Sequence, residues 1–400
     1  MKPVRRLLRR MRAGRRPRLA MAGALLLSAF AAWLLMPAST IAHKGNTSKY
    51  TYNDDVYPIL RDKCGRCHVA GGVAPMSLLS LKDEGGGAVA WAESIREMLV
   101  SEAMPPWYVD PTGPAVKNAY TLTPRELDMV ITWATGGTPQ GDLRKTPPEA
   151  KAQTHWGLGK PDLEISMAQP VTLGAGTMTE TADVMLATDL KETRWVKAAD
   201  LLPGTPSMVR RATISVVNGP VLAVWEPGDD AIATPGGAAF KLEAAARLRL
   251  QISYKKPWQE EQEAKSDRST IGLYFTDEPL SGKSIQAFSL DGNGDESTGP
   301  KSFGGAVTVS GRVLAVRAQL DQVYESITVM AVAASGRKVP ILKLRQARPE
   351  WPRRYWLADP IELPAGTKIE VVATPGDSNS GPLGAAFKQP LQIALDIVPQ

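Results

Sequence analysis

The sequence contains only three histidines and two cysteines among its 400 residues. His43, His68 and His155 all precede residue 156, so the remaining 245 positions, 156–400, have no imidazole. Catalytic arrangements of the Ser-His-Asp or Cys-His type therefore have no histidine to use in that region. A copper site of the usual nitrogen and sulfur ligands is excluded from it for the same reason.

Acidic residues are absent from positions 1–42, which carry nine Lys or Arg. The whole chain has a formal net charge of +6, so the positive excess lies in this leader and the rest is mildly acidic. A folded part without surplus positive charge gives no electrostatic basis for nucleic-acid binding. The composition, 43% hydrophobic and 22% charged, is that of a globular protein. Its length predicts two or three domains rather than one.

The leader begins MKPVRRLLRRMRAGRRPR and continues into the apolar run Leu19–Met36. A basic segment followed by an apolar run is an export signal. The run is also just long enough to span a bilayer. Residues 1–42 are therefore either a signal peptide, cleaved near Ala42, or an N-terminal membrane anchor. Both alternatives place the folded part in the periplasm or another extracytoplasmic space.

The two cysteines, Cys64 and Cys67, are followed directly by His68 in RDKCGRCHVAGG. C-x-x-C-H is the attachment motif of c-type haem, because two thiols at this spacing reach the two vinyl groups and the adjacent imidazole ligates the iron. A disulfide or redox pair does not require the histidine, and a zinc site needs four ligands, for which the sequence has no second Cys/His cluster. We therefore expect one haem c per chain, attached through Cys64 and Cys67, with His68 as the proximal iron ligand.

The second axial ligand has five candidates: Met76, Met98, Met104, Met129 and His155. Met104 is favoured because it begins MPPWY, where two prolines stop a helix and stiffen the chain that would present the thioether. Met76 lies only eight residues beyond His68, which leaves little chain to reach the opposite face of a haem. Met98 falls in a helical apolar pattern that predicts a core position.

The segment LTPRELDMVITWATGG carries the signals of a helix. Thr123 suits the N-cap, Pro124 the first helical position and Glu126 the first turn. We expect this helix to pack on an N-terminal helix formed by NDDVYPILRDKC. Together they predict a compact all-α haem domain over residues 50–142.

Residues 143–160 begin with a run of Pro, Lys and small polar residues that predicts a linker. The rest of the chain consists of short alternating or apolar runs separated by turn residues, which predicts antiparallel β-sandwiches. Its length favours two lobes, residues 161–280 and 281–400. The expected fold class is therefore multidomain α plus β.

Several segments resemble a known family. VYPILRDKCGRCHVAGGVAPMSLLS, AMPPW and LTPRELDMVITWATGGTPQGD resemble the small cytochrome c domain of bacterial copper type II, ascorbate-dependent monooxygenase-like proteins. WGLGKPDLEI, RWVKAADLLPG, SDRSTIGLYF and EWPRRYWLADPIELPAGTKIEVVAT resemble their two-lobed catalytic region, which is similar to peptidylglycine hydroxylating monooxygenase. The resemblance implies Met104 as the distal haem ligand. It also implies one copper per lobe, one held by three His and the other by two His and a Met.

The copper positions carry other residues in this chain. In the first lobe Arg210 and Arg211 stand where the family has a His pair, and Ser253 stands where it has a His. In the second lobe Val332 and Ala334 replace a His-x-His pair, and AAFKQPLQI lacks the methionine. We therefore expect no copper. We also expect at least one of the two arginines to lie at a strand edge or face solvent, because adjacent strand residues point to opposite faces.

The leading hypothesis is an exported mono-haem cytochrome that carries single electrons to redox partner proteins. Its β lobes would serve docking or assembly, and one alternative is assembly into a membrane-associated complex. Copper monooxygenase activity is not expected. The uncleaved leader would add a membrane contact. Two other hypotheses stay open: an ascorbate-dependent monooxygenase-like enzyme with a rebuilt metal site, and a structural subunit of a larger redox complex.

Overall fold

The computed structural model describes residues 47–400 except for 83–85, 149, 153, 280–281, 293–298 and 377–389. Ser48–Gln400 form one compact unit. The predictions for the leader, its run Leu19–Met36 and His43 lie outside the described residues. No helix of the described ranges is both long and apolar enough to cross a membrane.

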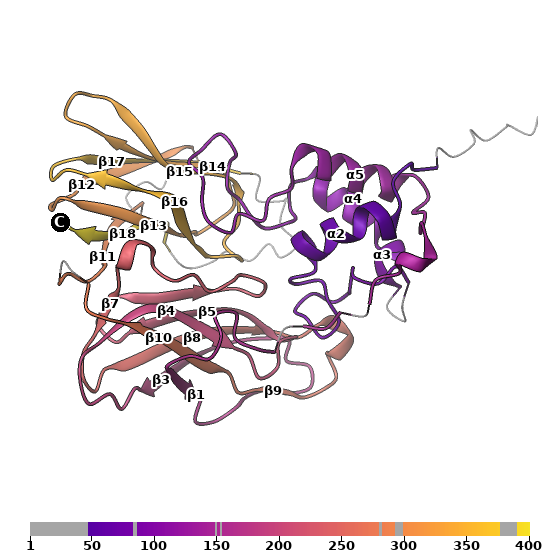
Figure 1. Cartoon of the computed structure of the whole chain (residues 1–400), viewed down its shortest axis with the longest axis horizontal. Helices are drawn as coiled ribbons and strands as arrows, with labels where there is room; N and C mark the ends of the chain where they lie inside the picture. Colours follow the sequence, from indigo (N-terminus) through magenta and orange to yellow (C-terminus); the bar gives the residue numbers. More distant parts are fainter. Residues whose placement is uncertain are drawn as a thin grey trace, which may run out of the picture. The chain divides into compact units, whose positions relative to one another are not determined.

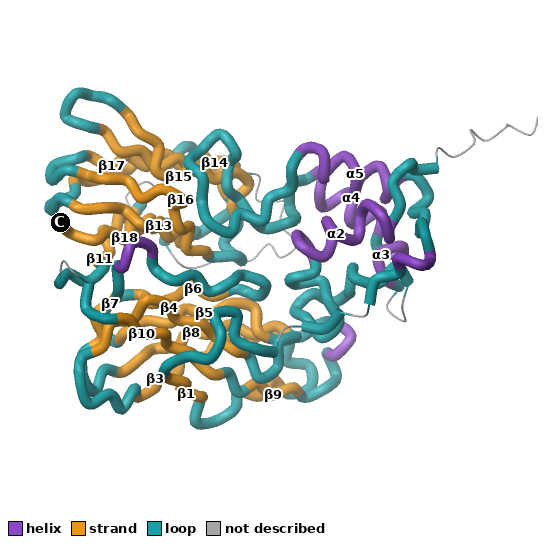
Figure 2. Tube along the Cα trace, in the orientation of Figure 1, coloured by secondary structure: helices purple, strands orange, loops and turns teal. Residues whose placement is uncertain are grey.

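Within the described residues, the α- and π-helices all lie before residue 136, and Figure 2 draws α2 to α5 in purple. They are η1 (Tyr52–Val56), α2 (Tyr57–Ile59), η2 (Leu60–Cys64), α3 (Gly87–Ala90), α4 (Ala92–Val100) and α5 (Pro124–Thr135). The first three follow one another without a break, so one helical stretch ends at Cys64. Tyr52 and Trp133 are buried in the core of this segment, with ring centroids 5.9 Å apart. The expected packing of the last helix on the first is therefore confirmed.

Helix α5 begins as its sequence predicts. The Thr123 side chain accepts a hydrogen bond from the backbone N–H of Glu126 at 3.2 Å, and the Glu126 carboxylate accepts one from the backbone N–H of Thr123 at 2.7 Å. This capping box satisfies two backbone donors that the first helical turn leaves unpaired. The helix stops at Gly136, where an added Cβ would lie 2.6 Å from the backbone nitrogen of Ser48.

After residue 160 the chain forms antiparallel sheets (Figure 1). The first sheet has the order β1 (Leu163–Ser166), β10 (Thr270–Thr276), β4 (Arg194–Leu202) and β7 (Phe240–Leu242). The second has the order β3 (Thr179–Ala187), β8 (Arg247–Lys255), β5 (Val209–Val216) and β6 (Val221–Trp225). A short ribbon joins β2 (Val171–Leu173) to β9 (Lys265–Asp267). Ile214, Leu250 and Leu273 are fully buried in the core that these strands enclose.

The remaining strands form two further four-stranded sheets. One has the order β11 (Gln286–Asp291), β18 (Gln392–Pro399), β13 (Gly311–Gln319) and β16 (Arg353–Leu363). The other has the order β12 (Lys301–Ala306), β17 (Lys368–Pro375), β14 (Tyr324–Val332) and β15 (Lys338–Ala347). Val316, Val329 and Leu395 are fully buried in their core.

The two groups of strands share buried contacts. Trp356 and Leu314 belong to the second group but pack in the core of the first. Arg354 of β16 donates hydrogen bonds to the carbonyls of Leu222 and Val221, each at 2.6 Å. These bonds satisfy backbone acceptors that would otherwise be costly to bury.

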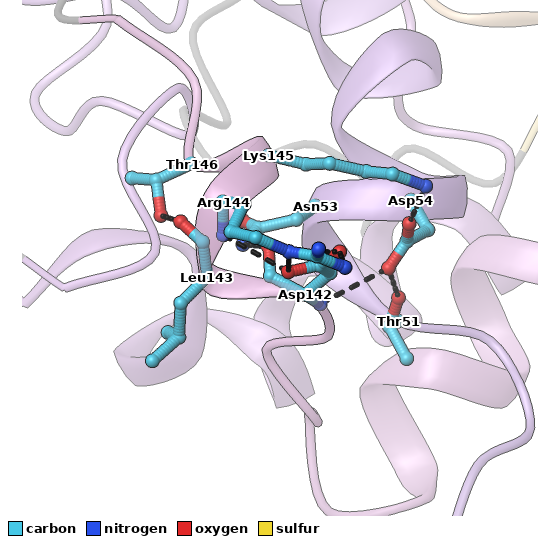
Figure 3. Close-up of polar contacts among 8 residues, drawn as sticks. All are labelled: Thr51, Asn53, Asp54, Asp142, Leu143, Arg144, Lys145 and Thr146. Carbon is cyan, nitrogen blue, oxygen red and sulfur yellow. Dashed lines mark hydrogen bonds and ion pairs between the residues drawn. The ribbon is translucent and has the colours of Figure 1, made fainter.

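The beginning of the predicted linker is attached to the helical segment (Figure 3). Asn53 donates to the Asp142 carbonyl at 2.8 Å, and Lys145 of the short turn η3 (Leu143–Lys145) pairs with Asp54 at 2.5 Å. Lys151 continues the attachment through a backbone bridge to Ala70. The described residues Leu143–Lys145 and Lys151 therefore contact the helical segment instead of spanning free space.

The described chain is thus mostly antiparallel β-sheet with few helices. The prediction of antiparallel sheets after residue 160 is therefore confirmed. Two short 3₁₀ turns, η4 (Pro235–Gly237) and η5 (Trp258–Glu260), interrupt the strands.

Candidate functional site

The CxxCH motif forms a tight turn where the first helical stretch ends. The backbone N–H groups of Cys67 and His68 both donate to the Cys64 carbonyl, at 3.1 and 2.9 Å. Gly65 fits here because a Cβ at this position would lie 2.7 Å from Leu79. Both cysteines are free thiols. The turn therefore holds two unpaired thiols and one imidazole close together.

All three side chains line one cavity with a volume of about 200 Å³. The other wall residues are mostly apolar and belong to the helical segment, for example Leu60, Leu99 and Trp107. Two wall residues, Arg210 and Trp351, come from the β strands and their loops.

Burial keeps the three motif side chains uncharged at neutral pH. It raises the pKa of the Cys64 and Cys67 thiols to about 12 and lowers the pKa of His68 to about 4. The backbone of Met76 opposes this shift of the His68 pKa, but burial dominates. All three residues are only half-buried by area, which we attribute to the surface that they expose to the cavity.

The donor set fits a haem. A neutral imidazole is the form that ligates a metal. His68 Nδ1 is buried and has no hydrogen-bond partner within ordinary geometry among the described residues. Unpaired thiols at CxxC spacing match covalent haem attachment.

Three of the five candidates for the second axial ligand share this cavity wall: Met76, Met98 and Met104. Met129 instead packs against the core of the helical segment, and His155 lines a separate surface recess. Met104 is thus placed with His68 and the two cysteines, and its choice over Met76 and Met98 stays a prediction.

Arg66 connects the motif to the β strands. It lies between the two cysteines and donates to the Gly228 carbonyl and to Asp230, each at 2.8 Å. Its guanidinium lies 3.9 Å from the ring centroid of Tyr120, whose hydroxyl also donates to Asp230, at 2.5 Å. Cys67 adds a weak bond from its sulfur to the Pro227 carbonyl at 3.2 Å. Sequence reasoning missed these contacts, because the x positions of CxxCH carry no signal of their partners.

A buried ion pair adjoins the same wall. Glu226 and Asp229 both pair with Arg353, the second at 3.5 Å, and the guanidinium of Arg353 lies 3.6 Å from the Trp107 ring centroid. Burial raises the pKa of Glu226 to about 7, although Arg353 acts to lower it. The charge of Glu226 also contributes to the raised pKa of Cys67. The motif and the ion pair are therefore electrostatically coupled.

The two arginines at the first-lobe copper positions are both half-buried, so the expectation that at least one lies at a strand edge or faces solvent is wrong. The register of β5 against β8 shifts between Val209 and Arg211, which places Arg210 in a β-bulge. A bulge breaks the alternation of side chains on which the expectation rested. Arg210 donates to the carbonyls of Val73 and Lys255. Arg211 donates to Ser253 Oγ at 3.3 Å and to the Pro349 carbonyl at 2.9 Å.

Arg210, Arg211 and Ser253 also line a second cavity, with a volume of about 1190 Å³. The residues expected at the second-lobe copper positions do not line it: Val332 ends β14 and Ala334 is exposed in the next turn. Most of AAFKQPLQI lies outside the described residues. Within the described ranges, no three His, Cys, Asp or Glu side chains gather in a group that could hold a metal ion.

Comparisons with known proteins identify no relative. No protein-family model and no curated protein matches the chain. Among solved structures, the major capsid protein P2 of bacteriophage PM2 matches with a TM-score of 0.25 and 10% identity, over 58% of this chain and 97% of its own. Allantoicase from Saccharomyces cerevisiae matches with a TM-score of 0.17 and 7% identity, over 55% and 77%. Oxalate decarboxylase from Bacillus subtilis matches with a TM-score of 0.14 and 10% identity, over 64% and 79%.

Proposed function

We propose that the chain is an exported mono-haem c-type cytochrome that carries single electrons. The observation that supports this most is the shared cavity of Cys64, Cys67, His68 and Met104. Haem c bound there supplies a one-electron Fe(III)/Fe(II) couple.

Each motif residue has a role that its surroundings favour. The thiols of Cys64 and Cys67 would hold the porphyrin edge, and neutral His68 would ligate the iron without first losing a proton. Met104 would complete the axial pair. The apolar wall excludes water and disfavours the extra positive charge of the ferric state, so the reduction potential is expected to be relatively high.

The β strands would place the haem segment for docking or assembly with redox partner proteins. The contacts of Arg66 with Gly228 and Asp230 support this, because they attach the motif itself to the β part of the chain. An extracytoplasmic location and redox partners remain parts of the proposal. The membrane contact through an uncleaved leader belongs to it as well.

A redox titration of the purified full chain tests the carrier function. The proposal expects one iron and no copper per chain, a reversible Nernst curve with one electron, and a low-spin spectrum in both states. Irreversible reduction, or a spectrum that lacks haem, would refute it.

A second candidate is a monooxygenase-like enzyme with a rebuilt metal site. The cavity of about 1190 Å³ around Arg211 and Ser253 favours it, because it offers room for a substrate next to the proposed haem. Stoichiometric copper, or hydroxylation of a substrate with ascorbate, would support this candidate against the carrier. If instead the chain is only a structural subunit, Cys67→Ser would remove the haem and leave a partner complex active.

A further inference from the structure

The wall of the CxxCH cavity carries positive charge without a matching carboxylate. Its cationic side chains are Lys63 and Arg210, and no Asp or Glu of the described ranges lines it. Desolvating a cation is costly unless an anion compensates for the lost water. The charge of this wall is therefore complementary to an anionic group inside the cavity.

Arg210 is held at the wall by two backbone carbonyls. Its Nε donates to Lys255 O at 3.2 Å, and its Nη1 donates to Val73 O. Val73 lies five residues beyond His68 and also lines the cavity. Among the described residues no hydrogen bond uses Nη2, so this nitrogen is available to a ligand.

The guanidinium of Arg210 stays protonated despite its burial. Burial lowers its pKa to about 10, while Cys67 acts to raise it. At neutral pH Arg210, which lies on β5, therefore places a full positive charge at the wall of the CxxCH cavity. A guanidinium forms stronger and more directional bonds with a carboxylate than with a neutral acceptor.

We propose that Arg210 binds a carboxylate of the haem and that the β part of the chain thereby forms one wall of the haem site. This rests on the proposed haem attachment, because the two carboxylates of haem c are the anions that the cavity would receive. Arg210 acts as a positioning residue: it holds the haem edge and the loop after His68 through the same guanidinium.

The proposal fixes the direction of a change in potential. The ferric haem carries one more positive charge than the ferrous haem. A nearby guanidinium therefore disfavours the ferric state, and removing its charge lowers the reduction potential. The pairing should also be visible in the vibrational modes of the haem carboxylates.

The test measures the midpoint potential and the resonance Raman carboxylate bending modes of the full-length protein. Arg210→Gln is expected to favour the ferric state about tenfold, which is a drop of about 59 mV for a one-electron couple. It should also shift one carboxylate mode. Arg210→Lys keeps the charge and should stay within roughly threefold of the wild type in the ferric-to-ferrous ratio, although its carboxylate mode shifts. Arg211→Gln is the matched control, because Arg211 carries the same charge on the same strand but does not line the cavity.

The outcomes separate the inference from the proposed function. If the wild type carries no covalent haem, the proposed function and the inference both fail. If it carries haem but Arg210→Gln leaves potential and carboxylate modes unchanged, the inference alone is overturned. An equal drop of the midpoint potential in Arg211→Gln would also overturn the inference. The loss of any positive charge on this strand would then explain the drop without a bond to the haem carboxylate. Should Arg210→Gln not accumulate, unchanged carboxylate modes in Arg210→Lys would overturn it instead.

Discussion

Met104 lines the CxxCH cavity together with two other methionines. Its position in the cavity wall alone therefore does not identify it as the iron ligand. Met98 lies on α4 and Met76 lies in the loop after the motif, and both line the same cavity. A thioether is a flexible, apolar side chain that often only fills space. The assignment of Met104 to the iron therefore needs a spectroscopic test.

Replacing Met104 by Ala should abolish the weak sulfur-to-iron band near the red end of the oxidised spectrum. It should also lower the reduction potential, because a thioether ligand favours ferrous iron. Met98→Ala is the matched control from the same wall and should keep the band. A band that persists in Met104→Ala and disappears in Met98→Ala would transfer the role to Met98.

Glu226 makes stability depend on pH. Its side chain is 1% exposed, and burial raises its pKa to about 7. The folded protein thus binds this proton more tightly than the unfolded chain, in which a Glu pKa is about 4.3. The contribution of protonated Glu226 to the free energy of unfolding is fully present below about pH 4.3 and is lost as the pH rises through about 7.

Glu226→Gln should flatten the pH dependence of the free energy of unfolding between pH 5 and 8. A shift of this size in one group corresponds to a change of roughly 3 kcal/mol across that range. Denaturant unfolding at both pH values measures it, and Glu243→Gln, at an exposed ion pair with Lys241, serves as the control. Parallel pH profiles for wild type and Glu226→Gln would contradict this account.

At the scale of the element, helix α5 depends on its capping box. Thr123→Ala removes the acceptor for the Glu126 N–H and should cost about 1 kcal/mol in local stability. Amide hydrogen exchange in the first turn should then accelerate roughly fivefold. Thr135→Ala is the control at the exposed end of the same helix and should leave that turn unchanged. Equal exchange rates in Thr123→Ala and the wild type would show that the cap is not what stabilises the turn.

The capping box and the bulge in β5 show what the sequence can predict. The start of α5 depends on Thr123, Pro124 and Glu126, which are neighbours along the chain, so it was predicted correctly. The side-chain directions of Arg210 and Arg211 depend on a register shift against β8, which is set by a strand about 40 residues away. Local alternation could not reveal that shift.

The candidate site also combines local features, which the sequence predicts, with contacts between distant parts of the chain, which it does not. The CxxCH motif is local, so the closeness of Cys64, Cys67 and His68 follows from the sequence, and their role as haem ligands stays a prediction. The partners of Arg66 lie more than 160 positions along the chain, at Gly228 and Asp230, and no spacing rule connects them. The contribution of Arg210 to the cavity wall is equally non-local.

At the scale of the whole molecule, hydrogen bonds join the CxxCH motif and the loop after it to the β part of the chain. Arg66 and Cys67 bond to the loop 227–230, and Arg210 bonds to the loop after His68. Partly buried, directional bonds of this kind fix orientation as well as adding stability. Under the proposed function, the haem segment carries the redox centre and the β strands position it.

Intact-mass measurement of the purified full chain, together with its absorbance spectrum, tests this claim most directly. The account predicts a mass equal to the polypeptide plus one haem, with a low-spin c-type spectrum. It also predicts that a Cys64→Ser, Cys67→Ser double variant loses the covalently bound haem. A chain with the bare polypeptide mass and two titratable thiols, obtained from a host that matures c-type cytochromes, would contradict it.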